Sequence, residues 1–478
     1  MRINTTSEHT GFSSLRMSRI DQVMQAYIDT HKFAGIVTLA AQHGEIIHFQ
    51  KYGFQVLETN QPMELDTLFR IYSMTKPITA VAVMMLLAGV LMQSIEGQEA
   101  RESYLSGLAR MHDGKYAAAI PFLDRAIELD DGASVFHLRR AECLYEQKDY
   151  TGALLDLGQA GLPDDGKAAF LAARCYAATG DVDKCLEAMR SHLESDEKLP
   201  ESTILLDEAF IPLENNRKWI DFWKKDWYTA EERRIADISY LVNSHHLLEA
   251  IDSLNRIIVP GKPDHRYFAL RARAFAGLGN LNNAAADYGR AIESSGNVPA
   301  YYLERAVLWS KLNKPERARE DYSSAIRLVP DDFDARYARA RICHNLSDLD
   351  AASKDMETLL RYFPDKTGFL YEAGMIYYQA GQYVKALPEF NKLLSISTDS
   401  ACYFRARADT YLKTEYFRYA IRDYSMALDL DPDDAACYLN KGKARFSLGD
   451  REGACIDWQK ALNRGSEEAD EMISKHCR

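Results

Sequence analysis

A column of alanines recurs every 34 residues through the second half of this chain of 478 residues, without one insertion or deletion. Twelve residues before each alanine stands a second small residue, and four residues after it stands a large one. Small residues at a fixed spacing let two helices approach closely, and the large side chain fills the remaining groove. A strict period of this length predicts an all-α solenoid of helical hairpins. The alanines are Ala284, Ala318, Ala352, Ala386, Ala420 and Ala454, and the second small residues are Ala272, Ala306, Ala340, Gly374, Ala408 and Gly442.

Prolines near the end of several periods support this division into hairpins. Pro330, Pro364 and Pro432 stand where a residue without an N–H group stops the second helix. The pattern resembles the tetratricopeptide repeat (TPR) over about residues 100–470. We expect three weaker repeats over 100–199, an irregular helical region with one degenerate repeat over 200–264, six regular repeats over 265–468, and a tail over 469–478.

A basic residue and an aspartate, 16 residues apart, recur at fixed positions of the repeat, beginning with Arg271 and Asp287. In one repeat Ala373 takes the place of the base while Glu389 remains. This separation puts the two side chains on facing helices of one hairpin, which favours an ion pair that fixes helix register. A ladder of anion-binding sites is the alternative. The further pairs are Arg305–Asp321, Arg339–Asp355, Arg407–Asp423, Lys441–Asp457 and Arg140–Asp156.

The first helices of stacked hairpins line a concave groove, near positions 2, 5, 9 and 12 of each repeat. Such a long groove suits an extended peptide or a helix, so the first hypothesis is a protein-interaction scaffold without catalysis in the repeats. The charged residues do not form the carboxylate clamp that some TPR proteins use. The predicted groove residues are aromatic and mildly basic: Arg273, Tyr337, Arg341, Tyr371, Met375, Tyr378, Arg405, Asp409 and Lys443.

Composition narrows the possible partners. The formal net charge is −12 and no basic stripe is present, which excludes nucleic acid as an expected partner. The eight cysteines include no C-x-x-C pair, so we expect no metal or other cofactor, and reduced, buried thiols.

Trp219, Trp223 and Trp227 are spaced for one helical face, which indicates a buried seam or an aromatic ligand-binding face.

The first ninety residues do not carry the repeat. A helix-like segment over about 17–31 precedes two runs of strand character, Ile36–Gln42 and Glu45–Tyr52, with a tight turn between them. The segment 67–77 (TLFRIYSMTKP) then resembles the active-site segment of the serine β-lactamase and penicillin-binding family, especially its class C-like esterases. A small, incomplete α/β fragment over 1–88 is therefore expected before the solenoid.

The resemblance implies a serine hydrolase as the alternative function, with Ser73 as nucleophile and Lys76 as general base one helical turn later. The family also needs a Y-x-N or S-x-N motif and a K-T-G strand. Ser295–Asn297 and Lys366–Gly368 match these strings, but the repeat register places the first in the turn between two hairpins and the second at a repeat boundary with no strand. We therefore expect the hydrolase segment to be truncated and inactive.

A run without charge, Pro77–Ile95, joins the two parts. It is read as the buried helix after the nucleophile, as a short membrane span, or as the apolar core of a secretion signal. We favour a combination of the first and third interpretations, in which a truncated hydrolase segment is fused to an exported repeat protein. The fusion is natural or an assembly product, and residues 89–99 form its signal-like junction. The start of the chain carries no signal sequence, which predicts a cytoplasmic protein whose repeats descend from an exported one, and a membrane location is not expected.

Overall fold

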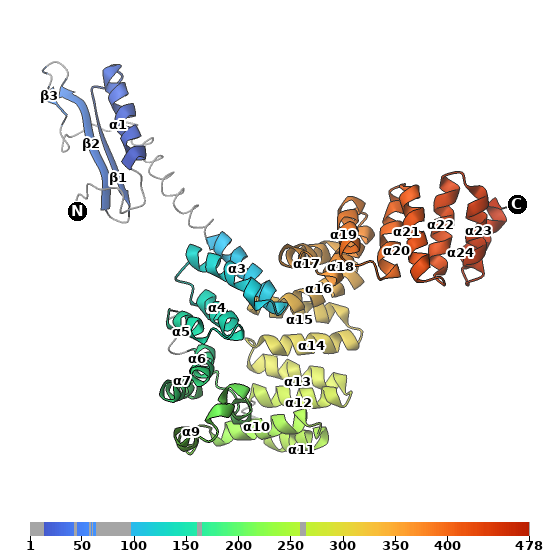
Figure 1. Cartoon of the computed structure of the whole chain (residues 1–478), viewed down its shortest axis with the longest axis horizontal. Coiled ribbons are helices and arrows are strands. Elements are labelled where there is room, and N and C mark those ends of the chain that lie inside the picture. Colours follow the sequence, from blue (N-terminus) through green and yellow to red (C-terminus); the bar gives the residue numbers. More distant parts are fainter. Residues whose placement is uncertain are drawn as a thin grey trace. The chain divides into compact units, whose positions relative to one another are not determined.

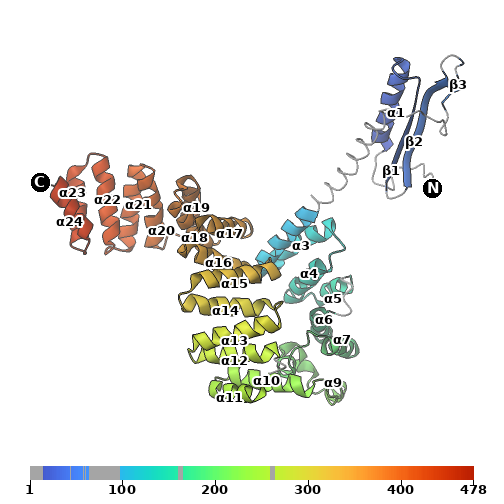
Figure 2. The ribbon, with the colours of Figure 1, turned by 180° about the vertical axis from the view of Figure 1, so that it is seen from behind.

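The computed structural model describes residues 14–42, 45–56, 59, 61–63, 97–159, 165–258 and 264–477. The chain divides into two compact units, Met1–Glu99 and Ala100–Arg478 (Figures 1 and 2). The first contains the strands and the second contains stacked helices, as predicted.

The described part of the first unit is a helix against a small antiparallel sheet. Helix α1 (Ser14–Asp29) precedes strands β1 (Gly35–Gln42) and β2 (Glu45–Val56), which pair from Gly35 opposite Gly53 to Gln42 opposite Glu45. The hydroxyl of Tyr52 on β2 donates to Asp21 on α1. The predicted pairing of the two strands is confirmed, and the predicted turn at residues 43–44 lies outside the described residues. A short strand, β3 (Gln61–Pro62), adds to β2 where none was expected.

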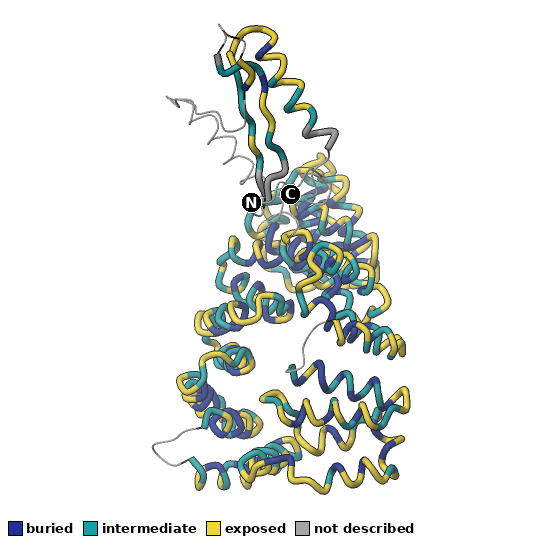
Figure 3. The backbone as a smooth tube through the Cα atoms, turned by 90° about the vertical axis from the view of Figure 1, so that its left-hand side faces the viewer, coloured by how far each residue is buried: buried dark blue, intermediate teal, exposed yellow. Residues whose placement is uncertain are grey.

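The second unit is built from consecutive antiparallel hairpins. A helix over residues 97–112 enters this unit at Ala100. In Figure 3 buried stretches of these helices alternate with exposed ones, because each helix packs on both its hairpin partner and the next hairpin. The further helices are α3 (Tyr116–Leu129), α4 (Ser134–Glu146), α5 (Tyr150–Gln159), α6 (Gly166–Thr179), α7 (Val182–Glu194), α8 (Glu201–Leu205), η2 (Glu208–Leu213), α9 (Arg217–Phe222), α10 (Ala230–Asn243), α11 (Leu247–Ile257), α12 (His265–Gly277), α13 (Leu281–Ser294), α14 (Pro299–Lys311), α15 (Pro315–Leu328), α16 (Phe333–Asn345), α17 (Leu349–Tyr362), α18 (Thr367–Gln379), α19 (Tyr383–Ile396), α20 (Ala401–Lys413), α21 (Phe417–Leu430), α22 (Ala435–Ser447), α23 (Arg451–Leu462) and α24 (Glu467–His476).

Size complementarity explains the two columns of the repeat. The large residue of each repeat lies against the small residue 16 positions earlier, on the other helix of the hairpin. A Cβ atom added at Gly374 would lie 2.5 Å from the ring of Phe390, and one at Gly442 would lie 2.4 Å from the indole of Trp458. These two positions are therefore filled by glycine because an alanine would collide with the facing Phe390 or Trp458 ring, whereas the repeats with a facing tyrosine accommodate alanine.

The turn inside each regular hairpin also repeats. One residue there has positive φ, and the following N–H closes a six-residue hydrogen-bonded turn, as between Asn280 and Phe275 at 2.8 Å. Glycine carries this conformation without steric cost, but half of the regular repeats use another residue. The positive-φ residues are Gly279, Asn313, Ser347, Gly381, Glu415 and Gly449.

The predicted ion pairs within hairpins are confirmed. Arg305 donates two parallel hydrogen bonds to Asp321, at 2.8 and 2.7 Å, and Asp321 is only 4% exposed. Where the base is missing, burial raises the pKa of Glu389. The basic side chains are already paired with buried carboxylates, so they do not form a ladder of anion-binding sites. Equivalent pairs are Arg271–Asp287, Arg339–Asp355, Arg407–Asp423 and Arg140–Asp156, and Lys441 approaches Asp457 at 4.0 Å.

The three-tryptophan prediction is half wrong. Helix α9 ends at Phe222, so Trp219 lies on it while Trp223 and Trp227 lie beyond it, and the three do not share one helical face. They nevertheless meet in one aromatic core, in which Trp219 stacks on Phe210 at 5.2 Å between ring centroids. Short capped segments, rather than one helix, bring them together.

The prediction that all cysteines are reduced is wrong for one pair. Cys455 on α23 and Cys477, just after α24, form a disulfide. The sequence pattern does not indicate this bond, because the two residues are 22 positions apart and the second lies outside the repeat. The other six cysteines are free, and all but Cys402 are buried.

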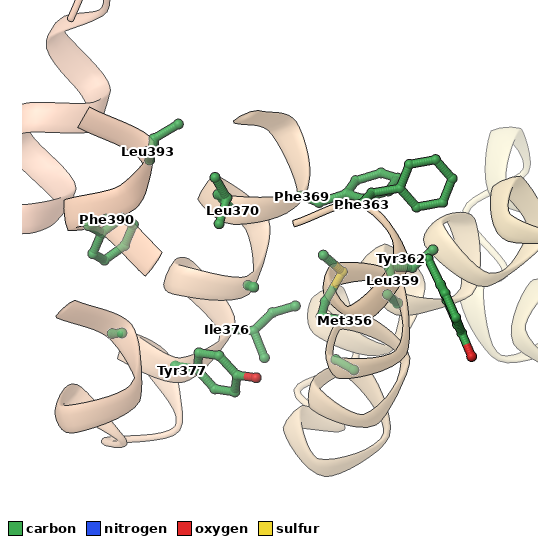
Figure 4. Packing of buried hydrophobic residues seen from close by; sticks show 14 of the residues in the cluster. Met356, Leu359, Tyr362, Phe363, Phe369, Leu370, Ile376, Tyr377, Phe390 and Leu393 are labelled. Carbon is green, nitrogen blue, oxygen red and sulfur yellow. The ribbon is translucent and has the colours of Figure 1, made fainter. Parts of the chain in front are cut away.

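The first helix of the second unit closes back onto the middle of the solenoid. Ala109 is fully buried in the core cluster of α16–α19, part of which is shown in Figure 4. Arg110 donates to the carbonyl of Tyr362 at 3.1 Å, and His112 lies 3.2 Å from Asp334. We call this contact the clasp: the helix over 97–112 held against the edge formed by α16, α17 and α18.

Candidate functional site

The predicted groove residues all lie on first helices of the regular hairpins. The hairpins follow one another along the stack (Figures 1 and 2). First helices of neighbouring hairpins contact each other, as α18 contacts α20 and α20 contacts α22, so residues at equivalent positions form a row. Arg273 lies on α12, Tyr337 and Arg341 on α16, Tyr371, Met375 and Tyr378 on α18, Arg405 and Asp409 on α20, and Lys443 on α22.

The aromatic members of the row are half-buried on the core of α16–α19. The ring of Tyr337 lies 4.8 Å from that of Phe369, and the ring of Tyr371 lies 5.4 Å from that of Tyr403. Burial raises the pKa of Tyr378 to about 12, so its phenol stays neutral at physiological pH. The row offers ring surface and hydroxyl groups rather than charge.

Most of the basic members already bind carboxylates of the next hairpin. Arg273 lies 2.6 Å from Glu304, and Arg405 lies 2.7 Å from Asp434. Lys443 lies 2.6 Å from Glu468. The face therefore presents less positive charge than its sequence implies.

Asp409 is committed to the packing between two hairpins. Its carboxylate accepts hydrogen bonds from the hydroxyl of Tyr424 at 2.5 Å and from the amide of Asn440 at 3.1 Å. Burial raises the pKa of Asp409 in spite of these two donors. Of the predicted residues, this one is placed to hold the hairpins together rather than to meet a ligand.

Arg341 differs from the other bases of the row. Its side chain is exposed, its guanidinium lies 5.9 Å from the ring centroid of Tyr337, and no ion pair joins it to another described residue. Beside it on α16, His344 contacts Glu372 of α18 at 2.7 Å through Nδ1, and Nε2 has no partner among the described residues.

Sequence reasoning missed His344, Glu372 and Tyr403. His344 stands at position 12 of its repeat, one of the groove positions, so the repeat register contained the signal that could have found it.

A cavity of about 360 Å³ lies elsewhere, in the irregular region of the solenoid. Its walls are mainly aromatic and aliphatic and include Trp219 and Trp223. The indole N–H of Trp223 is buried and has no acceptor among the described residues. Lys224 and Glu214 both line the cavity and oppose each other in charge, so the cavity specifies no charge on a ligand.

The hydrolase motifs are placed differently from what an active site needs. Ser73 and Lys76 lie outside the described residues. The string 295–297 lies in a turn, where the Ser295 hydroxyl bonds Asn297 at 2.8 Å, and the string 366–368 opens α18. Both placements agree with the repeat register, which predicted a turn for the first string and no strand for the second.

Two features are absent from the described part of the chain. No cluster of three or more His, Cys, Asp and Glu side chains there is arranged to bind a metal ion. None of the helices there combines the length and apolar character of a membrane span.

The tetratricopeptide repeat family matches residues 104–166, 303–355 and 345–401. These hairpins are tetratricopeptide repeats. Among solved structures, the TPR repeats are similar to YrrB, a TPR protein with an unusual peptide-binding site, at 20% identity and a TM-score of 0.36, covering 40% of this chain and 99% of that chain. The C-terminal part of a TPR repeat-containing protein from Cytophaga hutchinsonii matches at 18% identity and a TM-score of 0.41, covering 50% and 98%.

The segment before the TPR repeats has a separate ancestry. The Beta-lactamase family matches residues 20–92. Esterase EstB of Burkholderia gladioli is 41% identical over 71 residues, which are 15% of this chain and 18% of the esterase. Protein Rv1367c of Mycobacterium tuberculosis is 40% identical over 58 residues, 12% of this chain and 14% of that protein. The chain thus spans less than a fifth of these relatives and carries a short segment of the β-lactamase family.

Proposed function

We propose that the TPR unit is a scaffold that binds an extended peptide or a helix along the row of first helices, without catalysis in the repeats. The observation that carries this proposal is the contiguous aromatic surface over α16, α18 and α20, with Arg341 beside it as a cation that has no ion-pair partner among the described residues. Half-buried tyrosines lose little conformational freedom on binding, which makes them effective contact residues.

The surface defines what the ligand should carry. An apolar side chain would cover the rings of Tyr371 and Tyr403, and a carboxylate within reach of Arg341 would complete its charge pairing. His344, held by Glu372, would stand beside that carboxylate. This arrangement differs from a carboxylate clamp made of several basic side chains, because the neighbouring basic side chains already bind carboxylates of the protein.

Peptide arrays or pull-down with the full chain, followed by binding measurements on a captured peptide, test the proposal. We expect Arg341→Glu and Tyr371→Ala each to weaken binding about tenfold or more. Arg418→Glu is the matched control, because Arg418 is exposed on the second helix α21. Equal binding by Arg341→Glu and by the control variant would disprove the proposed site.

A second candidate function is serine hydrolysis by Ser73 with Lys76 as base, which would act on esters, β-lactams or peptides. The match of residues 20–92 to the Beta-lactamase family favours it. We propose that this activity is absent, because the matching segment is a small fraction of the esterase it resembles.

Covalent labelling separates the two functions. We expect a fluorophosphonate or a labelled penicillin to leave the full chain unmodified. Labelling that disappears in Ser73→Ala would establish the hydrolase instead.

The compartment is proposed from the cysteines. Disulfides persist in oxidising compartments, so the Cys455–Cys477 bond supports exported ancestry of the TPR unit over a cytoplasmic one. Alkylation of free thiols in intact cells, followed by mass spectrometry of the 455 and 477 peptides, should find these two cysteines unmodified. Full alkylation of both would favour the cytoplasm.

A further inference from the structure

Tyrosine stands at position 24 of three regular repeats, on the second helix of the hairpin. In two of them its hydroxyl reaches a carboxylate on a first helix. The Tyr288 hydroxyl donates to Glu304 on α14, to which Arg273 is also bound. The Tyr424 hydroxyl donates to Asp409 on α20 at 2.5 Å. Glu304 stands at position 6 of the next repeat and Asp409 at position 9 of its own, so the tyrosine hydroxyl lies between these two positions.

Tyr322 is the third of these tyrosines, and its surroundings differ. The two facing positions hold Val307 on α14 and Ala338 on α16, and neither side chain can accept a hydrogen bond. Ala338 packs against the core cluster that contains Tyr322. No hydrogen bond joins the Tyr322 hydroxyl to another described residue, and burial alone raises the pKa of this phenol. The hydroxyl is therefore a neutral donor that lacks the acceptor its two counterparts have.

The short side chains beside Tyr322 leave it open to a ligand. Val307 is exposed, and Tyr322 is 7% exposed, against 1% for Tyr288 and 0% for Tyr424. An arginine and a glutamate close over Tyr288 at the equivalent positions, whereas a valine and an alanine stand beside Tyr322.

Arg341 supplies a positive charge next to this tyrosine. It stands three residues after Ala338 on α16, and residues at this spacing are neighbours on a helix surface. Its guanidinium lies 5.9 Å from the ring centroid of Tyr337, so the side chain turns back toward the part of α16 where Ala338 lies. The carboxylate of the next first helix, Glu372, is bound by His344. Arg341 thus keeps its charge for a ligand on this side of α16.

We propose that a carboxylate side chain of the bound peptide takes the place beside Tyr322 that carboxylates of the chain take beside the other two tyrosines. It accepts the hydrogen bond of the Tyr322 hydroxyl and pairs with Arg341, while its methylene groups lie on Val307 and Ala338. This inference rests on the peptide-binding function proposed above and names the residues that select an acidic ligand.

An array of capped ten-residue peptides, each with a central glutamate and varied flanking residues, provides the probe. The strongest binder is compared in solution with the same peptide carrying glutamine in place of the glutamate, using the full chain. We expect the glutamate peptide to bind about tenfold more tightly, because a carboxylate forms the stronger hydrogen bond and the ion pair.

Removal of single hydroxyls separates a ligand contact from a structural one. Tyr322→Phe should weaken binding of the glutamate peptide about fivefold and leave the unfolding temperature unchanged, because this hydroxyl has no partner in the described chain. Tyr288→Phe is the matched control, since its hydroxyl already binds Glu304. It should lower the unfolding temperature and leave peptide binding unchanged. Unchanged binding by Tyr322→Phe contradicts the proposal.

Filling the site from within the chain is the second test. Val307→Arg combined with Ala338→Glu installs the arginine and glutamate that the preceding pair of first helices contains. The double variant should bind the glutamate peptide at least tenfold more weakly and lose the preference for glutamate over glutamine, without a lower unfolding temperature. Val384→Arg combined with Ala118→Glu adds the same charges at exposed positions of α19 and α3 and should bind like the unaltered chain.

The outcomes distinguish this site from the groove as a whole. Equal binding of the glutamine and glutamate peptides overturns the proposal, as does a glutamate preference that survives in the filled double variant. If either result accompanies weaker binding by Arg341→Glu and Tyr371→Ala, the groove function stands and the Tyr322 site alone is refuted. If no peptide of the array binds, both proposals fail.

Discussion

At the scale of single residues, the paired charges within the hairpins hold helix register. Arg305 and Asp321 form the cleanest pair, because Gly289 stands where other repeats offer the arginine a second acceptor. A buried carboxylate that loses its partner is left uncompensated, which costs far more than the pair contributes.

Arg305→Met should therefore lower the free energy of unfolding by about 3 kcal/mol, and adding Asp321→Leu should restore most of it. Urea unfolding of the two single variants and the double variant measures the coupling. If the double variant is as unstable as Arg305→Met, the cost is one of packing and the ion-pair account is wrong.

Asp409 is a half-buried carboxylate that has no ion-pair partner among the described residues of its hairpin. Burial raises its pKa more than the hydrogen bonds from Tyr424 and Asn440 lower it. A carboxyl group whose pKa is higher in the folded state stabilises the fold below its unfolded pKa, and that contribution is lost as pH rises through the folded pKa.

Asp409→Asn keeps an acceptor for Tyr424 and removes the charge, so it should raise stability at pH 7 by about 1 kcal/mol. The two proteins should converge below the pKa of an unfolded aspartate, about 4. Thermal unfolding across this pH range provides the measurement. A constant difference at all pH values would show that ionisation of Asp409 is not responsible.

At the scale of elements, the turn between paired helices has the same backbone conformation in every regular repeat, although the residue type that carries the positive φ differs. Glu415 has a φ of 64°, where Gly381 and Gly449 stand in the neighbouring repeats. A side chain in this region costs roughly 1 kcal/mol relative to glycine.

We expect Glu415→Gly to stabilise the chain by about 1 kcal/mol, and Gly381→Ala to destabilise it by a similar amount. Differential scanning calorimetry of both variants checks the two signs. Destabilisation by Glu415→Gly would mean that the glutamate side chain makes a contact that outweighs its backbone strain.

The repeat helices were predictable because their information is local and periodic. The alanine column, the large residue facing Gly374 and the pairing of Arg305 with Asp321 all follow from spacing along one hairpin. The inter-hairpin partners were not predictable in this way. Glu304 of the next repeat forms an ion pair with Arg273, and Asn440 of the next repeat donates a hydrogen bond to Asp409. The composition of the groove therefore suggested more unpaired charge than the structure presents.

The irregular region and the termini lie outside any period. Trp219 and Trp223 are separated by a helix end that their spacing did not reveal, and Cys477 meets Cys455 only after α24 folds back. The clasp depends on how successive hairpins are placed in space, which single-sequence reasoning about spacing cannot supply.

At the scale of the whole TPR unit, the clasp connects two stretches that nearest-neighbour packing would leave independent. A solenoid without such a contact loses cooperativity as it lengthens, because each hairpin is stabilised only by its neighbours.

Ala109→Glu should therefore broaden the urea unfolding transition and lower its slope by a measurable fraction, as the unit separates into parts that unfold at different denaturant concentrations. Ala118→Glu, at an exposed position of α3, is the matched control. An unbroadened transition in Ala109→Glu would show that the hairpin stack alone accounts for the cooperativity of the unit.

The order of folding follows from the same contact. Most pairings in this unit lie within one or two repeats and form quickly, but Arg110 must meet Tyr362 across 252 positions. Closing so long a loop is entropically costly until the intervening hairpins have stacked and shortened the gap. The clasp therefore forms only after the hairpins between its two sides have stacked, and during synthesis Ala109 stays uncovered until more than two hundred further residues have emerged.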